Sequence, residues 1–463
     1  MGTTLAIIIT TIGVVLATLI PTFIINNKKK TSGEDWAIAS RELPLFVVVG
    51  TQFASVIGGG VLVGHLGNAY TNGIGVAIYG IIMVMPFIVL MYLANWLRNN
   101  QFSTIPEIFK SFTGNSKAIT VLAAVMTMLF PFGWITSQIT AFGSIYSTLT
   151  GLDYNMLCII FALVSLFFIM PAGLKTVAWT DFIFACFMGL MLIATLVYGT
   201  SMAGGWSEIS SKVDPANLTL SGSVGKIGLS TVFLWVFAIL PGGMTNQLYY
   251  QRICAINDGK KVNKSLLISA IVSFVGFCWA VYMGITISSI NPNIEGSVAT
   301  GWFMGELPTP LLAGFAALIF ATMMSTVSSG VQSIVVNVTR DIMPSVKSDY
   351  TEEKSLKLSR ILSLVVIVFS LIMCLVFTDT LTWLVATAGF SAATLLCPIF
   401  VGYAMKDKNF ITNQGIVASM IFGAIGGAIG MILKTAINYA AIGILFSFIA
   451  LISVSALTKK QKQ

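Results

Sequence analysis

The chain has 463 residues, of which 56% are hydrophobic and only 9% are charged, and its mean hydropathy is +0.91. This balance excludes a soluble core with an ordinary charged surface. The formal net charge of +8 does not require a nucleic-acid partner, because the loops between membrane spans account for it.

Apolar runs of about 20 residues, long enough to span a bilayer as helices, recur along the chain. We therefore predict an all-α polytopic membrane protein with about thirteen transmembrane helices. The first run, Gly2–Ile25, lacks the basic lead-in and cleavage site of a signal peptide, so we expect it to be retained. The expected spans are 2–25, 44–71, 73–97, 118–149, 155–171, 177–203, 227–251, 263–290, 309–338, 357–379, 380–404, 412–434 and 436–457.

Basic residues set the expected orientation of these spans. Placing Lys28–Lys30 in the cytoplasm leaves three of the 25 Lys and Arg residues outside, as the positive-inside rule requires. Those three are Lys212, Lys226 and Lys434. An odd number of spans then puts the N-terminus outside and the C-terminus inside. We expect the protein to lie in the cell membrane, specifically a bacterial cytoplasmic membrane.

The apolar stretch Gln52–Tyr70 is interrupted by the consecutive glycines Gly58, Gly59 and Gly60. Each glycine costs a helix about 1 kcal/mol relative to alanine, so we expect the helix to break there. Backbone carbonyls freed inside a membrane must line a cavity or be buried in protein. The break therefore suits a cation or solute site near the midplane. Tight helix packing through small residues is the alternative interpretation.

A second interrupted span, Leu234–Tyr250, contains the sequence Pro241-Gly242-Gly243. Each break opens a group of five expected spans, and the two groups run in opposite directions across the membrane. We interpret them as an inverted repeat, because paired interruptions in two halves indicate the central site of a transporter. In order, the expected units are an extra N-terminal span, the first repeat, the second repeat, and two C-terminal spans with a cytoplasmic tail: 1–30, 44–203, 227–404 and 412–463.

Hydroxyl side chains are concentrated in Phe320–Thr339. Ser325, Ser328 and Ser329 stand at positions i, i+3 and i+4, so they share one helix face, and Thr322 lies a turn earlier. A hard cation such as sodium prefers several oxygen ligands, which carbonyls and hydroxyls supply without adding charge. Alternatively, each hydroxyl bonds only the carbonyl four residues back in its own helix.

Several motifs, in order along the chain, resemble those of the sodium/solute symporter family. They are DWAIASREL before the first break, GLKTVAWTD at 173–181, TNQLYYQR at 245–252 and ATMMSTVSSGVQSIVVNVTRDI at 321–342. The resemblance implies a five-plus-five inverted-repeat core that works by alternating access. It also implies a first sodium site with the ligands Ala54, Ile57, Thr322, Ser325 and Thr326.

Asp181 is the one acid that we expect to lie within a span, close to its inner end. A charge in a membrane helix is costly, so it usually faces a cavity or an ion path. The resemblance implies a second sodium site, and hence two coupled ions instead of one; its residues are Asp181, Ser325, Ser328 and Ser329. An interfacial aspartate that caps a helix is the alternative. Phe184 replaces a glutamine that many relatives carry.

The expected solute site lies between the two breaks and consists of Gly58, Gly59, Gly60, Val61 and Asn246. The resemblance places Asn246 among the substrate contacts and Tyr249 at an inner gate. Gly60 and Val61 stand where the sugar-transporting branch has a Glu-Gln pair, which argues against a sugar. Val56 and Asn246 stand where the choline branch has tryptophans, which argues against choline. A small polar organic solute is therefore expected.

His65 is the only histidine and lies about two turns past the glycines, where the resemblance places an outer-gate side chain. A packing residue and a proton relay are the alternatives. Without a second histidine or an acid pair expected at the midplane, we favour sodium over proton coupling. Arg252 and the pair Arg340-Asp341, near inner span ends, are interpreted as topology anchors.

The six cysteines are scattered, so no disulfide framework or metal cluster is indicated. No nucleophile–base pair or metal-ligand spacing points to an enzyme. We therefore predict a secondary transporter in the lipid bilayer that couples inward sodium flow, of one or two ions, to uptake of the solute. The alternatives are a transporter-like sensor or channel without coupled uptake, and a proton-coupled symporter.

Overall fold

The computed structural model describes residues 38–169, 174–347, 350–376, 380–435 and 438–460, together with isolated positions before residue 38. The expected first span, 2–25, therefore lies outside the described residues except at those isolated positions. Lys28–Lys30 also lie outside them. Secondary structure in the described part of the chain is helical, apart from an isolated bridge between Leu43 and Ile256.

The helices follow the expected spans closely. The first group consists of α3 (Leu45–Val56), η2 (Gly60–His65), α4 (Leu66–Asn72), α5 (Ala77–Asn99), α6 (Ile105–Thr113), α7 (Lys117–Thr127), α8 (Leu129–Thr150), α9 (Tyr154–Ile169) and α10 (Leu174–Met202). Two short helices follow, α11 (Trp206–Lys212) and α12 (Leu220–Ile227). The boundary of the seventh expected span moves slightly, because Gly228 with φ +83° ends α12 before α13 begins.

The second group begins with α13 (Leu229–Leu234), η5 (Trp235–Ile239), α14 (Leu240–Met244), α15 (Gln247–Ala255) and α16 (Val262–Ile290). It continues with α17 (Ala299–Gly305), α18 (Thr309–Val336), η8 (Asn337–Ile342), α19 (Met343–Val346), α20 (Glu352–Val376) and α21 (Thr380–Ala404). The last two helices are α22 (Asn413–Ile432) and α23 (Tyr439–Lys460).

Ten helical stretches in the described residues are long and apolar enough to cross a membrane, and two shorter apolar helices accompany them. The short ones are Leu45–Val56, the first half of a broken span, and Tyr154–Leu166. The stretch Gly60–Asn99 contains both the second half of that broken span and the next expected span. The molecule is thus a multi-helix membrane protein, while the count of thirteen spans and the orientation of the termini stay predictions.

The expected break at the glycines is confirmed. Helix α3 ends at Val56, and Ile57 has non-helical backbone angles of φ −88° and ψ 72°. The chain resumes as a wide π-helical turn at Gly60, where the amides of Val61 and Leu62 both donate to the carbonyl of Gly58. Glycine suits this segment because it packs closely against α8: an added Cβ atom at Gly58 would lie 2.6 Å from the Gln138 Oε1, and one at Gly59 would lie 2.5 Å from the Cβ of Ala141.

The second break is also present, but it lies three residues later than the sequence predicted. Pro241, Gly242 and Gly243 are helical in α14, and the helix ends instead at Thr245 and Asn246. Pro241 lies two residues after the π-turn η5, in a helical stretch that is continuous from Leu229 to Met244, so the proline does not break the helix. Asn246 ends the break by capping α15, since its side-chain oxygen accepts from the amide of Leu248 at 3.1 Å.

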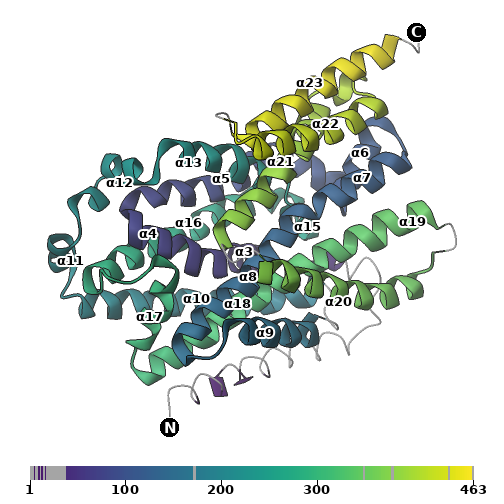
Figure 1. Ribbon diagram of the computed structural model, residues 1–463. Helices are drawn as coiled ribbons and strands as arrows, with labels where there is room; N and C mark the ends of the chain where they lie inside the picture. Colours follow the sequence, from purple (N-terminus) through teal and green to yellow (C-terminus); the bar gives the residue numbers. More distant parts are fainter. Residues whose placement is uncertain are drawn as a thin grey trace.

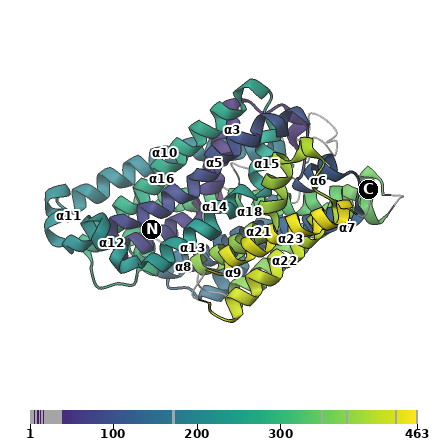
Figure 2. The same cartoon turned by 90° about the horizontal axis from the view of Figure 1, so that it is seen from above.

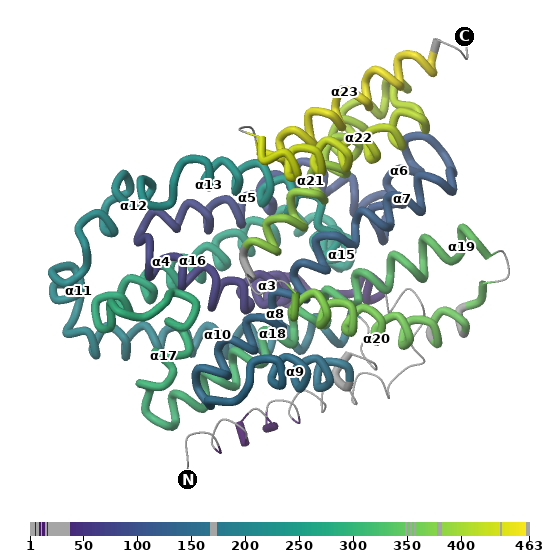
Figure 3. The backbone as a smooth tube through the Cα atoms, in the orientation of Figure 1, coloured from purple at the N-terminus to yellow at the C-terminus, as the bar shows by residue number. Residues whose placement is uncertain are grey.

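The helices pack into one elongated bundle. In Figure 1, α11 and α12 lie at one end, and α6 and α19 lie at the other. The tube in Figure 3 shows α3, α8, α10 and α18 near the middle. Buried polar side chains on these helices include Thr51, Gln138, Asp181 and Ser329. Helices α22 and α23 lie side by side against α21 at one edge, as the turned view in Figure 2 also shows. Gly58, Gly59, Thr245 and Asn246 are buried, so both breaks lie within protein instead of facing lipid.

Replacing Gly59 by alanine should destabilise the fold. A Cβ atom at Gly59 would lie 2.5 Å from the Cβ of Ala141 and 3.0 Å from the Cε of Met323, whereas one at Gly60 would lie 3.8 Å from its nearest neighbour. Overpacking of this kind costs about 1–3 kcal/mol. We expect Gly59→Ala to lower the thermal unfolding midpoint of the purified protein, with Gly60→Ala as the matched control. Equal midpoints for the two variants would show that close packing does not fix the break.

Candidate functional site

The residues expected to bind the first sodium lie where the end of α3 contacts α18. The Thr326 Oγ1 donates to the carbonyl of Thr322 at 2.9 Å. It also lies 3.5 Å from the carbonyl oxygen of Ala54 and 3.4 Å from that of Ser55. The hydroxyl therefore does more than bond its own helix, because carbonyls from two helices surround it.

Other members of the predicted first site are arranged differently. Ile57 follows α3 directly, so its carbonyl falls at the break. Ser325 directs its hydroxyl to Asp181 and not toward Thr326. The hydroxyl of Thr322 donates to the carbonyl of Ile319 at 2.9 Å, which leaves its backbone carbonyl as the group near Thr326. The structure thus brings the Ala54 and Thr322 carbonyls and the Thr326 hydroxyl together.

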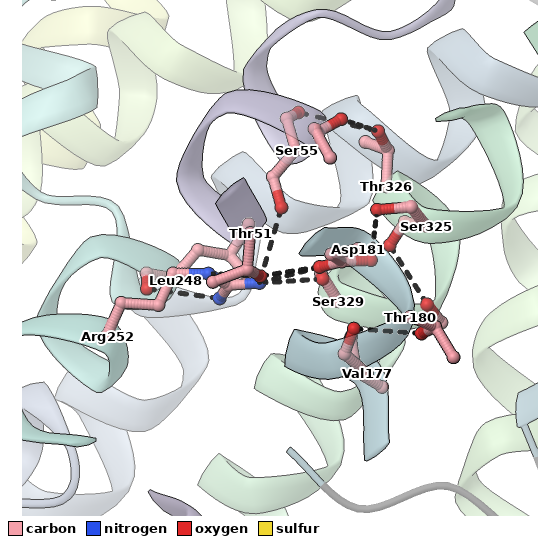
Figure 4. Close-up of polar contacts among 12 residues, drawn as sticks. Thr51, Ser55, Val177, Thr180, Asp181, Leu248, Arg252, Ser325, Thr326 and Ser329 are labelled. Atoms are coloured by element: carbon pink, nitrogen blue, oxygen red, sulfur yellow. Dashed lines mark hydrogen bonds and ion pairs between the residues drawn. The ribbon is translucent and has the colours of Figure 1, made fainter. Parts of the chain in front are cut away.

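Asp181 lies inside α10 and its side chain is fully buried. Its Oδ2 accepts a hydrogen bond from the Thr51 hydroxyl at 2.5 Å, and its Oδ1 accepts one from Ser325. Figure 4 shows these side chains converging from α3, α10 and α18. The alternative of an interfacial helix cap is therefore wrong for this residue.

The guanidinium of Arg252 reaches the same cluster from α15. Its Nη2 donates to Ser329 at 2.7 Å and to Thr51 at 3.1 Å, and it lies 3.8 Å from the Asp181 Oδ2. Both charged side chains are fully buried. The interpretation of Arg252 as a topology anchor is wrong. A buried carboxylate needs a partner, and an arginine shortly after the second break was the signal that the sequence offered.

The predicted second-site residues are only partly assembled around Asp181. Ser325 and Ser329 both point into this cluster, but the Ser328 hydroxyl donates to the Ser325 carbonyl in its own helix at 2.9 Å. Thr51 and Ser55, which the sequence analysis did not name as site residues, supply further hydroxyls from α3. Their spacing of four residues on one face of α3 could have indicated this role.

A small cavity adjoins the first break, next to the predicted solute residues. Its volume is about 20 Å³, which is room for about one water molecule. Polar and aromatic side chains share its wall with backbone at the break. The lining residues are Ser55, Val56, Gly58, Gly60, Val61, Tyr79, Met83, Trp134, Ser137, Gln138 and Leu384.

Gln138 connects this cavity to the break, although sequence reasoning missed it. Its Oε1 accepts from the amide of Gly59 at 2.5 Å, and its Nε2 donates to the carbonyl of Trp134 at 3.1 Å. Gln138 is buried on α8, so it satisfies a backbone amide that the break leaves without a helical partner. A single glutamine in an apolar span was the available signal.

Asn246 lies at the second break, fully buried. Its Oδ1 caps α15, and its Nδ2 has no hydrogen-bond partner among the described residues. Asn246 is not among the residues that line the small cavity. The structure therefore leaves a buried donor at the second break but does not join it to the cavity at the first.

The two expected gate residues are buried among aromatic rings. His65 packs against Tyr79 and Phe277, with ring centroids 5.3 and 5.0 Å apart. Tyr249 packs against Phe87 at 4.6 Å and Trp134 at 6.2 Å. Because Tyr79 and Trp134 also line the small cavity, each expected gate residue lies next to one of its walls.

Arg340 and Asp341 tie η8 to the loop before α6 at the end of the bundle near α19. The fully buried Asp341 accepts a hydrogen bond from Thr104 at 3.0 Å, and Arg340 donates to the Ser103 hydroxyl at 3.3 Å. Gln247, from the start of α15, accepts from the Ile105 amide at 2.8 Å. Asp341 therefore joins two elements through a buried hydrogen bond, a role that the interpretation as a topology anchor did not predict.

A much larger groove, of about 1260 Å³, runs between α3, α10 and α16. Its walls are mostly apolar, with side chains such as Phe46, Ile193 and Val275 that are exposed on the outside of the bundle. Exposed apolar side chains on membrane helices are expected to meet lipid. The groove does not suit a polar solute.

Residues 36–423 match the model of the sodium:solute symporter family. A sodium/proline symporter of Staphylococcus aureus is 23% identical over 412 residues, which cover 84% of this chain and 79% of that protein. Sodium/proline symporters from other strains of the same species match equally well.

Solved structures show the same fold. A sodium-coupled sialic acid symporter in a substrate-bound outward-open state superposes with a TM-score of 0.84 at 17% identity, covering 98% of this chain and 97% of that chain. Mhp1, a nucleobase-cation-symport-1 family transporter in a closed conformation, superposes with a TM-score of 0.55 at 12% identity, covering 94% and 95%. With its helix breaks, its buried hydroxyls and a family match over most of its length, this chain belongs to the sodium:solute symporter family and is a membrane transporter, not an enzyme.

Proposed function

We propose that this protein couples the inward flow of sodium to the uptake of a small polar organic solute across a bacterial cytoplasmic membrane. The observation that carries the proposal is the position of Thr326, whose hydroxyl lies within 3.5 Å of carbonyl oxygens from both α3 and α18. Family membership supports the same function. In the S. aureus relative the solute is proline, and in the structural neighbour it is sialic acid.

The proposed ion site uses uncharged oxygens at the first break. The carbonyls of Ala54, Ile57 and Thr322 would be ligands, together with the hydroxyls of Ser325 and Thr326. Such oxygens suit a hard cation of single charge, because they attract it without holding it as tightly as several carboxylates would. To reach the ion, the Ser325 hydroxyl would exchange its bond to Asp181 for a contact with the ion.

The proposed solute site lies beside this ion, at the cavity lined by Gly58, Gly60 and Val61. Gln138 would supply polar contacts and Trp134 an apolar wall. Asn246 lies outside this cavity and would contact the solute only after the helices around the two breaks have moved apart. The cavity wall contains no charged side chain, which fits a polar solute of low net charge. At about 20 Å³ the cavity is too small for an organic molecule, so solute entry requires the surrounding helices to move apart.

Movement of this kind is what alternating access requires. We propose that the segments 44–203 and 227–404 form an inverted repeat, with the two breaks at corresponding positions near its centre. In the proposed orientation, the end of the bundle with α6 and α19 faces the cytoplasm. Lys212 and Lys226 lie at the opposite end, on α11 and α12, among the few basic residues assigned to the outside.

Removing the Thr326 hydroxyl should weaken sodium binding. We expect Thr326→Ala to raise the sodium concentration for half-maximal uptake at least tenfold, which corresponds to about 1.4 kcal/mol, because one oxygen ligand is lost. Thr326→Ser keeps the hydroxyl and should stay near wild type. Ser328→Ala is a second control, since its hydroxyl bonds the Ser325 carbonyl in its own helix. Uptake assays in proteoliposomes over a range of sodium concentrations measure the effect.

The same proteoliposome uptake assay also tests whether transport depends on sodium at all. Uptake that runs equally well in potassium, driven by a pH gradient alone, would contradict sodium coupling and favour a proton-coupled symporter. Binding of solute without any uptake would favour the sensor interpretation instead.

Replacing Asn246 by serine should separate its two roles. Serine is a good helix cap, so Asn246→Ser preserves the start of α15 but removes the unpartnered Nδ2 donor. We expect solute affinity to fall about tenfold with little change in sodium affinity or thermal stability.

The solute must be identified before this affinity can be measured. A thermal-shift screen of the wild type against amino acids, monocarboxylates, polyols and nucleobases, with and without sodium, serves that purpose. Solute affinity within about twofold of wild type would show that Asn246 is only structural.

A further inference from the structure

Two cysteines that lie far apart in the sequence meet in the folded protein. The Sγ atoms of Cys158 on α9 and Cys374 on α20 are 3.6 Å apart, and both side chains are fully buried. All six cysteines lie in described helices and are free thiols. The other two buried ones, Cys254 and Cys397, direct their thiols to backbone carbonyls, at 3.8 and 3.5 Å. The scattered cysteines of the sequence thus include one pair of adjacent sulfurs.

Hydroxyl groups surround the sulfur of Cys374. The Thr140 hydroxyl on α8 lies 3.3 Å from it, as a donor that is shared with the carbonyl of Thr136, and the Tyr154 hydroxyl lies 3.5 Å from it. Cys374 donates to Cys158, whose own thiol donates to a backbone carbonyl of α8 at 3.5 Å. A thiol reacts as its thiolate, and nearby donors stabilise the negative charge of that form. Cys374 is therefore placed to attack an oxidant, with Cys158 in contact to complete the reaction.

Helix α8 leaves room for the two sulfurs at Gly143. A Cβ atom there would lie 2.5 Å from the Cys158 Sγ and 2.6 Å from the ring of Tyr154. Helices α9 and α20 contact each other and both contact α8. The sulfurs are therefore enclosed by three packed helices, and joining them requires movement of two side chains without the docking of a distant helix.

The pair lies near the end of the bundle that the proposed orientation places outside the cell. Cys158 is one turn after the start of α9, and Cys374 is in the last turn of α20. Residues 151–153, which lead into α9, are exposed. They follow α8 directly, and α8 contacts α17, which lies towards the end with α11 and α12 in Figure 1. Thiols on the outer side of a membrane are not kept reduced by the cytoplasmic thiol systems.

We propose that Cys158 and Cys374 form an oxidation site that a peroxide converts into a disulfide between α9 and α20. The Cys374 sulfur attacks one peroxide oxygen and the O–O bond breaks. The sulfur becomes a sulfenic acid, and the released hydroxide takes up the thiol proton and leaves as water. The Cys158 sulfur then attacks the sulfenic sulfur, so the S–S bond forms and the sulfenic oxygen leaves as a second water with the proton of Cys158. The two thiols lose two electrons, and the peroxide gains them.

The disulfide would join positions 216 residues apart in the chain. A cross-link that closes so long a loop restricts the unfolded chain, so the oxidised protein should unfold at a higher temperature than the reduced protein. The proposal uses the proposed orientation of the protein but not its sodium coupling.

The test maps the thiols after oxidation. Purified protein in lipid nanodiscs is treated with hydrogen peroxide, quenched with catalase, unfolded in excess N-ethylmaleimide and digested for mass spectrometry. We expect a disulfide-linked peptide pair that contains Cys158 and Cys374, and alkylated Cys254 and Cys397. Replacing the exposed Cys186 and Cys278 by serine prevents cross-links between molecules.

A matched variant separates the disulfide from other effects of the oxidant. In the same background, Cys158→Ser should leave Cys374 as a sulfenic acid that dimedone labels. Peroxide should raise the thermal unfolding midpoint of the parent protein, and dithiothreitol should reverse that rise. The midpoint of Cys158→Ser should not rise with peroxide.

The proposal is overturned if Cys158 and Cys374 are both alkylated after a treatment that oxidises the exposed cysteines of the wild type. A disulfide from either residue to a different cysteine would also overturn it. If Cys158→Ser fails to fold, the peptide map of the parent protein decides alone. Sodium-dependent uptake is measured separately, so failure of the proposed function and failure of the oxidation site are distinguishable.

Discussion

The fold depends on how the protein satisfies the backbone groups exposed by the break after α3. A membrane offers no water to pair with free amides and carbonyls, so other parts of the protein must supply partners. Gln138 on α8 accepts from the Gly59 amide, and Thr326 on α18 approaches the carbonyls of Ala54 and Ser55. The same groups that stabilise the break therefore form the proposed ion and solute sites.

A second constraint is the buried pair of Asp181 and Arg252. Each charge would be costly alone in the interior, and together with the hydroxyls around them they form a satisfied polar network. The pair also connects α15, which follows the second break, to α10 and α18. Any movement of α15 relative to those helices must either break this network or move it as a unit, which links the second break to the proposed ion site.

The cavity at the first break is small in this conformation. The cavity of about 20 Å³ at the break excludes an organic solute, and aromatic residues such as Tyr79 and Trp134 form part of its wall. At the end of the bundle near α6 and α19, Asp341 contacts Thr104 and Gln247 contacts Ile105. These contacts join η8, the start of α6 and the start of α15. In the proposed transport cycle, these contacts would have to open before a solute could reach that end of the bundle.

The sequence alone determined the membrane class, the approximate bounds of the long helices in the described residues and the break at Gly58–Gly60, because hydropathy and glycine act locally along the chain. It misplaced the second break, since the chain stays helical through Pro241, Gly242 and Gly243 and the capping side chain of Asn246 decided where α15 starts. Only the tertiary structure revealed that Gln138 pairs with Gly59 and that Arg252 neutralises Asp181. Such pairings join residues that are far apart in the chain, and no local pattern specifies which buried donor meets which acceptor.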